Sequence, residues 1–582
     1  MRCLCFLYKC TLTNKSKAFN HLITPFWLVI WSCTLTVGWL LPNHYRPWAA
    51  FHSDAWIAAT LLIAAIAVTW RSRGSIQVHI ISALVALLIF VPWLQVGFGL
   101  ISQPGVAWIS SAYLLGLLLA LLIGVRWESD SPGQLGDGLF FAIGMAAILS
   151  VGLQLQQWFQ LEGLDLWRLG GGAERPHANL GQANQLGTLL IWGVLAGAWG
   201  YFRKYISGKV AVFLAVYLLF GVALTGSRTA WIGVALLVAT GWLWRRHLHS
   251  PRVPWIVSGL GLYFVVCVLS VGWLNQIWLA KAPLGLDDFT RMSSEIRPLA
   301  WVAFLDAAWQ RPFFGYGWNQ VVLAQMAVAT EHPHIPGFFI YSHNLFLDLV
   351  LWCGIPMGLL VSGFLVMWLW QRFHAVQSAE NAVLVLFLLV VANHAMLELP
   401  LHFAYFLLPV GLVMGVLDAR MGVRPVFLLG RWTLGVLWLV ASMLLCLIIQ
   451  DYARVESSYQ ILRLEWSRIK ITIPVGPPDV LLLTQWRDYI KFARMEPKRD
   501  VGEDELVWMR NITGLFPGVI FFHKFATVLA LNQRPEEAQL WLKRMCKTVS
   551  ESECRDVQTI WANQSLKVPE IAAIAWPVKT AE

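Results

Sequence analysis

Three polar residues stand directly before a long apolar run in the segment Tyr341–Pro356, YSHNLFLDLVLWCGIP. A helix that enters a bilayer needs a polar start, but Lys or Arg would serve there as well as Ser342, His343 and Asn344. Imidazole is the side chain best suited to take a proton from a hydroxyl group near neutral pH. His343 is therefore a candidate general base. The alternative is a histidine that only caps the helix or fills the core.

Three arginines lie in segments that we expect on the side of the membrane where Lys and Arg are otherwise rare. Arg228 stands in LTGSRTAW, Arg175 in ERPHANLGQANQLG, and Arg297 in SSEIRPLAWVAFLDAAW. An arginine costs roughly 2.5 to 3.5 kcal/mol at the bilayer centre and less near its edge, so charges there are functional by default. The guanidinium fork fits phosphate oxygens in pairs, which favours a diphosphate held at the lipid–water boundary, as on a polyprenyl-linked donor. The alternatives are arginines that snorkel or are solvated, or a partner for Glu398.

Motifs of several other chemistries are missing from the chain, among them His-Glu-x-x-His, G-x-S-x-G and the P-loop. His332-Pro333-His334 indicates a rigid turn more than a metal site, and Asp287-Asp288 is a lone acidic pair. We therefore predict a reaction without a metal ion or other cofactor. Arginines would then stabilise the charge that develops on a departing pyrophosphate.

The composition indicates which elements must hold these residues. Of 582 residues, 58% are hydrophobic and 13% charged, whereas a soluble chain carries about 25% charged residues. The apolar residues fall in blocks of roughly 17 to 25, long enough to cross about 30 Å of hydrocarbon as helices. We predict an all-α polytopic membrane protein. The net charge of +10 does not indicate nucleic acid, because the basic residues lie between the apolar blocks.

About thirteen spans are predicted from these blocks. They centre on Phe26–Leu41, Ala55–Trp70, His79–Leu94, Ala107–Val125, Gly138–Trp158, Leu186–Tyr201, Val210–Thr225, Ala230–Trp244, Trp255–Trp273, Leu345–Trp370, Ala382–Leu397, Phe403–Leu417 and Leu434–Ile449. The basic segment 1–23, with no small-x-small cleavage site after the first span, is predicted to be a cytoplasmic N-terminus. Basic residues then recur in every second loop, as the positive-inside rule requires. The transmembrane domain is predicted over 24–449, with long outer, periplasmic loops at 159–185 and 275–341.

An odd number of spans places the polar segment 450–582 on the outer side as a helical domain. HKFATVLALNQRPEEAQLWLKRM predicts two amphipathic helices around an Asn-Gln-Arg-Pro turn. This pattern fits one tetratricopeptide-type (TPR-like) unit or a small helical domain without a repeat. Cys546 and Cys554 are the only cysteines of this segment, and an oxidising compartment would allow them to bridge.

Many short stretches, in order, resemble the PglL-type bacterial protein O-oligosaccharyltransferases of the O-antigen ligase and polymerase superfamily. PNHYRPWAAFHSD resembles the family's first outer loop, and RPHANLGQANQLGT its Arg…Gln-x-Asn segment. GSRTAW, RPLAWVAFLDAAWQRPFFGYGWNQ and SHNLFLDLVLWCGIP resemble the shared ligase core. HAMLELPLHFAYFLLP and the tail opening QDYARVE resemble the protein-transferring branch. The resemblance covers nearly the whole chain after the first twenty or so residues.

The resemblance implies a GT-C-like O-antigen ligase fold in the bacterial inner membrane, with the active site facing the periplasm. Such enzymes transfer a whole glycan from undecaprenyl pyrophosphate to Ser or Thr of a periplasmic protein, often type IV pilin. By position, His343 resembles the essential histidine proposed to activate the acceptor hydroxyl. Arg228 and Arg297 resemble the arginines proposed to hold the pyrophosphate, and Gln182 and Tyr405 match polar positions of the protein-transferring branch.

Further substrate-site candidates lie in the same stretches, namely Asn184, Asn344, Glu398 and His402. Many superfamily members carry an acid where this chain has Trp352, and Glu398 is a candidate substitute because HAMLELPLHF returns to the outer face. Two other functions remain open: an O-antigen ligase or polymerase, and a polysaccharide or lipid transporter. The LELPLHFAYF stretch and the large tail disfavour the former, and charges gathered at the outer ends of the spans disfavour the latter.

Overall fold

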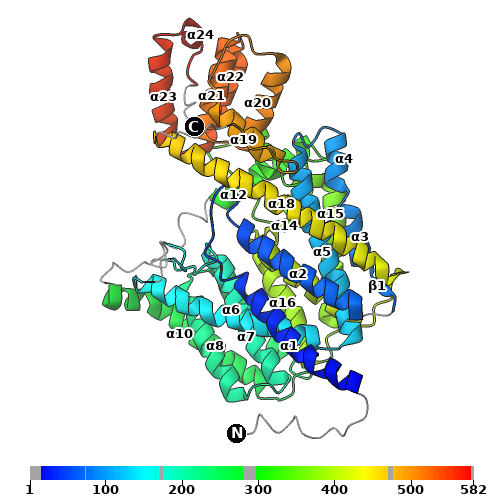
Figure 1. Ribbon diagram of the computed structural model, residues 1–582. Coiled ribbons are helices and arrows are strands. Elements are labelled where there is room, and N and C mark those ends of the chain that lie inside the picture. Colours follow the sequence, from blue (N-terminus) through cyan, green and yellow to red (C-terminus); the bar gives the residue numbers. More distant parts are fainter. Residues whose placement is uncertain are drawn as a thin grey trace.

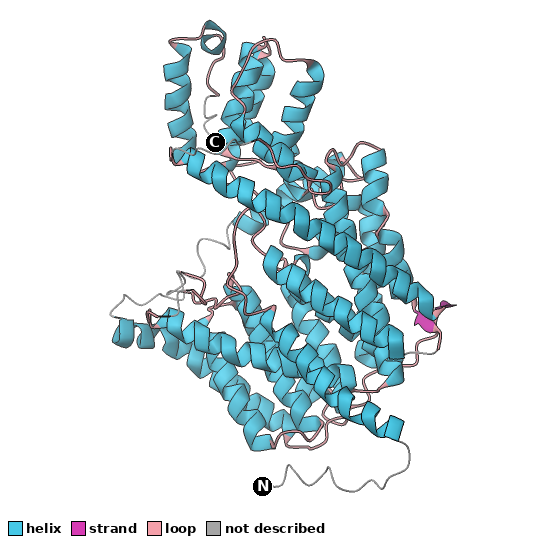
Figure 2. Cartoon of the chain, viewed as in Figure 1, coloured by secondary structure: helices cyan, strands magenta, loops and turns pink. Residues whose placement is uncertain are grey.

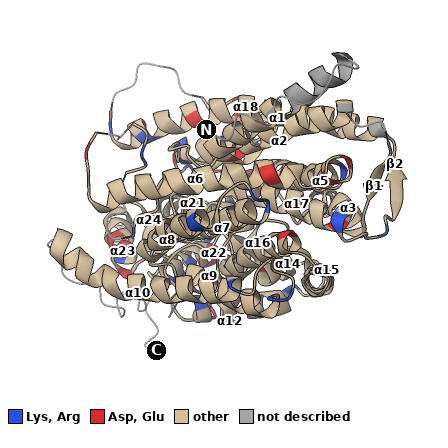
Figure 3. Cartoon of the chain, turned by 90° about the horizontal axis from the view of Figure 1, so that it is seen from below, with Lys and Arg blue, Asp and Glu red and all other residues tan. Residues whose placement is uncertain are grey.

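The computed structural model describes residues 15–71, 74–163, 166–170, 175–279, 296–469 and 476–577. Nearly all regular structure in these ranges is helical (Figure 2). The exception is a small antiparallel sheet in which β1 (Ile76–Val78) pairs with β2 (Phe427–Leu429). Figure 3 shows the long helices from below, drawn almost entirely in the colour of uncharged residues. The predicted all-α polytopic membrane fold is confirmed.

Every predicted span falls on a helix. The unbroken helices are α1 (Lys15–Val37), α2 (Phe51–Arg71), α5 (Pro104–Asp130), α6 (Gln134–Trp158), α7 (Ala183–Phe202), α8 (Gly208–Leu224), α9 (Arg228–Leu243), α10 (Val253–Leu279), α16 (Ala379–Ala395), α17 (Ala404–Arg420) and α18 (Arg431–Trp466). Seven helical segments among the described residues are long and apolar enough to cross a membrane by length and composition, and others are shorter. The count of about thirteen spans stays a prediction.

Two spans that were predicted as single helices are broken in the structure. One consists of α3 (Ile80–Leu88) and α4 (Val91–Gly97), and the other of α14 (Leu345–Cys353) and α15 (Ile355–His374). The second break has a steric cause at Gly354, which has φ +84° and would place a Cβ 2.3 Å from the carbonyl oxygen of Phe313. Only glycine adopts this conformation and this close approach readily. The break ends α14 after 9 residues.

Charged residues from separate loops meet at one end of the helix bundle. Arg203 binds Asp137 at 2.9 Å and Glu380 at 3.4 Å. Arg420 binds Glu380 at 2.7 Å and Glu128 at 2.6 Å. These residues come from four loops or helix ends that the alternating basic pattern had placed on one side, the predicted cytoplasmic side. Their contact supports the alternation.

The chain after α17 leads to a second group of helices at the opposite end of the molecule (Figure 1). α18 passes through the predicted boundary at residue 450 as one continuous helix. The helices that follow are α19 (Thr484–Arg494), α20 (Glu503–Leu515), α21 (Val519–Leu531), α22 (Pro535–Thr548), α23 (Glu551–Ser565) and α24 (Pro569–Ala572). α21 and α22 are the two helices predicted around the Asn-Gln-Arg-Pro turn. The group has a hydrophobic core of its own, with Phe522, Phe525 and Trp541 at its centre.

The described part of the predicted outer loop 275–341 includes the helices α12 (Ile296–Gln310) and α13 (Val321–Val328), and the 3-10 helix η2 (Pro400–His402) lies after α16. The first part of this loop, with Asp287 and Asp288, lies outside the described residues. α13 contacts both α14 and α20. The outer loop therefore lies between the membrane helices and the C-terminal helices.

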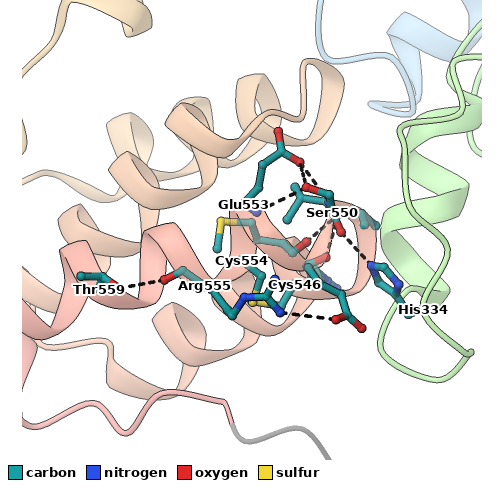
Figure 4. Close-up of a disulfide and its surroundings, with 12 residues drawn as sticks. His334, Cys546, Ser550, Glu553, Cys554, Arg555 and Thr559 are labelled. Atoms are coloured by element: carbon teal, nitrogen blue, oxygen red, sulfur yellow. Dashed lines mark hydrogen bonds and ion pairs between the residues drawn. A yellow bond between two sulfur atoms is a disulfide. The ribbon is translucent and has the colours of Figure 1, made fainter.

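Cys546 and Cys554 form a disulfide that joins α22 to α23 (Figure 4). We expect neither thiol to react with a maleimide in denatured, unreduced protein, and both to react after reduction. The measurement is the mass shift of purified protein labelled with and without reductant, and the Cys546→Ser/Cys554→Ser variant is the control because it should show no reductant-dependent gain. Equal labelling of the wild-type protein before and after reduction would contradict the bridge.

Candidate active site

Glu398 lies in the short link between α16 and η2, and only 4% of its surface is exposed. Its carboxylate accepts hydrogen bonds from four side chains. Oε1 accepts from Arg297 Nη2 and from Asn184 Nδ2, the latter at 3.0 Å. Oε2 accepts from Gln182 Nε2 at 3.2 Å and from His343 Nδ1 at 3.0 Å. An ionised carboxylate offers about four acceptor positions, so this group is saturated.

The four donors reach Glu398 because three helices begin beside it. Gln182 is the N-cap of α7 and Asn184 lies in its first turn. Arg297 is the second residue of α12, and His343 directly precedes the N-cap of α14. The start of a helix carries partial positive charge, which favours an anion nearby. The link after α16 therefore brings its carboxylate to a place where three helix starts already stabilise negative charge.

The protonation of the His343 ring follows from its contact with Glu398. A carboxylate only accepts hydrogen bonds, so Nδ1 of His343 must carry the proton that is donated. In the neutral ring, Nε2 then holds a lone pair. The side chain is 25% exposed, so part of the imidazole is open. A histidine oriented by a carboxylate through Nδ1, with a basic Nε2, has the arrangement of a general base.

The alternative role for His343 was to cap a helix, but a neighbouring residue caps α14. Asn344 is the N-cap of α14, and its side-chain oxygen accepts from the amides of Phe346 at 3.1 Å and Leu347 at 3.2 Å. The Asn344 amide also donates to the carbonyl of Met396 at 3.3 Å. Asn344 thus ties the start of α14 to the link that carries Glu398.

His343 has φ +61°, an unusual conformation for a residue with a Cβ. Its neighbours hold this turn in place. The amide of Ser342 donates to Asp348 Oδ1 at 2.7 Å, and Trp301 Nε1 donates to the carbonyl of Ser342 at 2.8 Å. Strained backbone of this kind costs about 1 to 3 kcal/mol and persists only where surrounding contacts fix it, most often at functional sites.

The carboxyl of Glu398 stays ionised near neutral pH. Burial alone would raise its pKa. The hydrogen bond from His343 and the positive charge of Arg297 lower the pKa by more than burial raises it, to about 2. An ionised Glu398 supports the Nδ1-protonated tautomer of His343, because it offers no proton of its own.

The three predicted arginines converge on the same region. Burial lowers the pKa of Arg175 below its usual value; the charge of Glu398 raises that pKa, and the charges of Arg228 and Arg297 lower it. Arg175 also donates from Nε to the carbonyl of Thr225 at 3.4 Å, in the turn that leads to α9. Arg228 begins α9 and is exposed. Arg297 is an ion-pair partner of Glu398. Among the described residues, three guanidinium groups thus lie close enough to one another and to Glu398 to interact electrostatically.

Two predicted site residues lie apart from Glu398. Tyr405 is 1% exposed, and its hydroxyl donates to Gln185 Oε1 at 2.8 Å inside the helix bundle. His402 Nε2 lies 3.6 Å from Asp348 Oδ2, and its ring centroid lies 3.8 Å from that of Tyr341. His402 therefore packs behind the His343 turn rather than beside the Glu398 carboxylate.

The histidines of the His-Pro-His segment have protein partners. His332 Nε2 lies 3.0 Å from Asp306 Oδ2, and His334 Nε2 donates to the carbonyl of Val549 at 2.7 Å. Within the described ranges there is no group of three or more His, Cys, Asp or Glu side chains that could hold a metal ion. The segment acts as a structural connection.

Sequence reasoning missed Asp348 and Trp301, which fix the backbone on one side of His343. Asp348 carried a usable signal, because an acid in the first turn of an apolar helix breaks the membrane rules. Trp301 gave none, since tryptophans are frequent in this chain. Trp352 packs against Trp318 and His402.

Two parts of the chain match known families. Residues 213–362 match the family described as O-antigen ligase, and residues 382–561 match the family described as virulence factor membrane-bound polymerase, C-terminal. The first match includes Arg228, Arg297 and His343, and the second includes Glu398. Both sides of the His343–Glu398 contact therefore lie within the matched regions.

Two proteins of Acinetobacter baylyi are similar to this chain. A general O-oligosaccharyltransferase is 28% identical over 545 residues, which is 90% of this chain and 93% of that protein. A ComP-specific O-oligosaccharyltransferase is 33% identical over 250 residues, which is 42% of this chain and 44% of that protein. The first similarity extends over both the membrane helices and the C-terminal helices.

We expect Glu398→Gln to lower the free energy of unfolding by about 1 to 3 kcal/mol, because buried donors lose their charged acceptor. The lowered pKa of Glu398 gives a stabilisation that is fully present above about pH 4.5 and is lost as the pH falls towards 2. The difference in the free energy of unfolding between the wild-type protein and the variant should therefore be constant from pH 8 to pH 5 and shrink at lower pH. Thermal unfolding in detergent, followed by tryptophan fluorescence, measures it.

The matched control is Glu331→Gln, which makes the same change at an exposed side chain of the outer loop. Its unfolding should equal that of the wild-type protein at every pH. A stability difference for Glu398→Gln that vanished between pH 8 and pH 5 would contradict the low pKa.

Proposed function

We propose that this chain, which belongs to the PglL-type protein O-oligosaccharyltransferases of the O-antigen ligase superfamily, transfers a preassembled oligosaccharide from a lipid-linked donor to a serine or threonine of an acceptor protein. The chain is a multi-pass membrane glycosyltransferase. The observation that carries the proposal is the contact of His343 Nδ1 with Glu398 beside three arginines. This arrangement supplies a base and an anion-binding region in one place.

The donor in this proposal is undecaprenyl pyrophosphate carrying the glycan. Arg175, Arg228 and Arg297 would hold its pyrophosphate, because each guanidinium fork matches two phosphate oxygens. Three guanidinium groups in one region would suit a group with more than one negative charge. Arg297 uses Nη2 for Glu398, and its other donors would remain for the phosphate.

The proposed reaction is a displacement at the anomeric carbon of the first sugar. Nε2 of His343 takes the proton of the acceptor hydroxyl as its oxygen forms a bond to the anomeric carbon. The bond from that carbon to the phosphate oxygen breaks, and undecaprenyl pyrophosphate leaves with the electron pair. The arginines stabilise the charge of the leaving group, so this scheme needs no metal ion. Glu398 stabilises the imidazolium that forms, and the proton then passes to water.

The proposed place of the reaction is the periplasmic face of the bacterial inner membrane, and type IV pilin is a candidate acceptor. Support comes from the chain topology. The site lies at the starts of α7, α9 and α14, whereas the Arg203 and Arg420 ion pairs lie at the end that is predicted to be cytoplasmic. An acceptor that is folded outside the cytoplasm would meet the site at that face.

The alternatives are weaker. An O-antigen ligase or polymerase would use the same donor chemistry with a sugar acceptor, but the general O-oligosaccharyltransferase shares similarity with 90% of this chain. A transporter should place polar groups of broken helices near mid-membrane. Here the polar cluster lies at helix starts, as a reaction at the membrane surface requires.

We expect His343→Ala to abolish glycan transfer while the protein still inserts into the membrane. The ring is partly exposed and is not the cap of α14, so its loss should cost little stability. The assay is the gel shift of an acceptor protein in a host that makes the lipid-linked glycan. His52→Ala is the control, because it removes a partly exposed histidine at the predicted outer start of α2. Undiminished transfer by His343→Ala would refute the base assignment.

We expect Arg228→Ala and Arg297→Ala to raise the donor requirement or lower turnover at least tenfold, with the acceptor dependence little changed. The loss of a charge-assisted bond to phosphate costs about 1.5 to 3 kcal/mol. Replacement of either arginine by lysine should restore activity only in part, because lysine keeps the positive charge but lacks the paired donors of the guanidinium group. Titration of the lipid-linked donor at fixed acceptor peptide, and then the reverse, measures both dependences.

Arg311→Ala is the matched control, since Arg311 is an exposed arginine of the same outer loop that packs over Tyr316. Its donor and acceptor titrations should match those of the wild-type protein. A change confined to the acceptor titration of Arg228→Ala and Arg297→Ala would mean that these arginines bind the protein substrate.

A further inference from the structure

A short segment of the outer loop connects the C-terminal helices to the turn that carries His343. We name this segment, His334–Phe339, the strap. His334 Nε2 donates to the carbonyl of Val549 at 2.7 Å. The amide of Ile335 donates to the carbonyl of Lys547 at 3.1 Å, and the amide of Gly337 donates to that of Thr548 at 2.7 Å. Three consecutive carbonyls of the C-terminal domain thus accept hydrogen bonds from the strap.

The partner of the strap is itself held in place. Residues 547–549 are the last two residues of α22 and its C-cap, and the disulfide Cys546–Cys554 spans them (Figure 4). Ser550 and Glu553 form a capping box at the start of α23. A turn that is closed by a disulfide and a capping box has few alternative conformations, so it offers the strap a fixed edge.

The other side of the strap reaches His343. Gln325 of α13 is buried; its Nε2 donates to the carbonyl of Gly337 at 2.9 Å, and its Oε1 accepts from the amide of Phe339 at 2.8 Å. The ring of Phe339 meets the ring of His343 edge-on, with 5.8 Å between centroids. Phe339 also packs against Phe304 of α12. The imidazole is therefore fixed by Glu398 at one nitrogen and by the strap at its ring.

We infer that the C-terminal domain positions His343 for transfer by holding the strap, and that His334 and Phe339 are positioning residues. This inference rests on the proposed function. In the described residues, the hydrogen bonds of Glu398 come from α7, α12 and the His343 turn, so the domain acts through the strap rather than on the carboxylate. A displacement of about 1 Å at a reacting group lowers rates by up to roughly 100-fold.

A second attachment of the domain allows the strap to be tested separately. The amide of Gly105, at the start of α5, donates to Thr484 Oγ1 at 3.2 Å. Gln103 Nε2 donates to Asp488 Oδ2 at 3.1 Å. These contacts join α19 to the membrane helices and lie outside the strap. Loss of the strap bonds should therefore loosen the His343 turn while the domain stays attached.

The test uses the full-length protein in detergent or nanodiscs with lipid-linked glycan and an acceptor peptide. His334→Ala should lower kcat about three- to tenfold, as the loss of one hydrogen bond in a positioning contact does, with the donor and acceptor KM values nearly unchanged. His334→Gln should recover most of the rate, because its amide nitrogen still reaches a carbonyl. Thr484→Val removes two hydrogen bonds of the second attachment, to the Gly105 amide and to Gln103 Oε1, and should keep the wild-type kcat.

Hydrogen–deuterium exchange gives a readout that does not depend on activity. Peptides that cover residues 334–344 should exchange faster in His334→Ala than in Thr484→Val or the wild-type protein. Reduction of the Cys546–Cys554 disulfide in the folded wild-type protein should likewise make residues 334–344 exchange faster and should lower kcat. This experiment needs no substitution, so it tests the strap even if a variant does not fold.

The inference is overturned if kcat stays within twofold of wild type in both His334→Ala and the reduced protein. It is also overturned if Thr484→Val loses as much kcat as His334→Ala, because the effect would then be general loosening of the domain. A wild-type protein that transfers no glycan would refute the proposed function instead. In that case, unchanged exchange over residues 341–344 in His334→Ala would still refute the role of the strap, because hydrogen–deuterium exchange does not depend on activity.

Discussion

A buried negative charge must be matched by hydrogen bonds. The carboxylate of Glu398 is such a charge, and its donors come from distant parts of the chain. An unpaired carboxylate at 4% exposure would be strongly unfavourable. Its four donors come from chain segments near residues 182, 297 and 343. The starts of α7, α12 and α14 must therefore meet at the end of α16. The same carboxylate that needs these donors also fixes one of them, His343, in a single orientation and tautomer.

The need to pair this charge explains why a fully hydrogen-bonded carboxylate lies beside a strained backbone turn. The turn at His343 has a positive φ, which a chain tolerates only when neighbouring contacts fix it. Asp348 and Trp301 fix the backbone of Ser342, and Phe339 packs against the imidazole ring. The backbone turn and the ring of His343 are thus both held in place, while the side chain stays 25% exposed. Arginines around the same carboxylate supply positive charge that Glu398 alone does not neutralise.

Much of the fold follows from the sequence, because hydrophobic length sets the position of a membrane helix and basic residues set the side of each loop. The two helix breaks were not predictable from apolar length, since the break at Gly354 depends on its approach to Phe313. Residues that violate membrane rules, such as His343 and Arg228, were identifiable as candidates for the same reason. The roles of Trp301 and Gln325 depend on contacts between distant segments, which no local pattern contains. Gln182 was named only through resemblance, and the structure places it on Glu398.

The central claim is that Glu398, His343 and the arginines form one site for a lipid-linked glycan. The most direct measurement is a cryo-electron microscopy structure of the protein with undecaprenyl-pyrophosphate-linked glycan bound. The account predicts that the pyrophosphate lies among Arg175, Arg228 and Arg297, that Nδ1 of His343 stays on Glu398, and that Nε2 faces the anomeric carbon. A pyrophosphate bound elsewhere on the protein, with the His343–Glu398 pair facing away from the sugar, would contradict it.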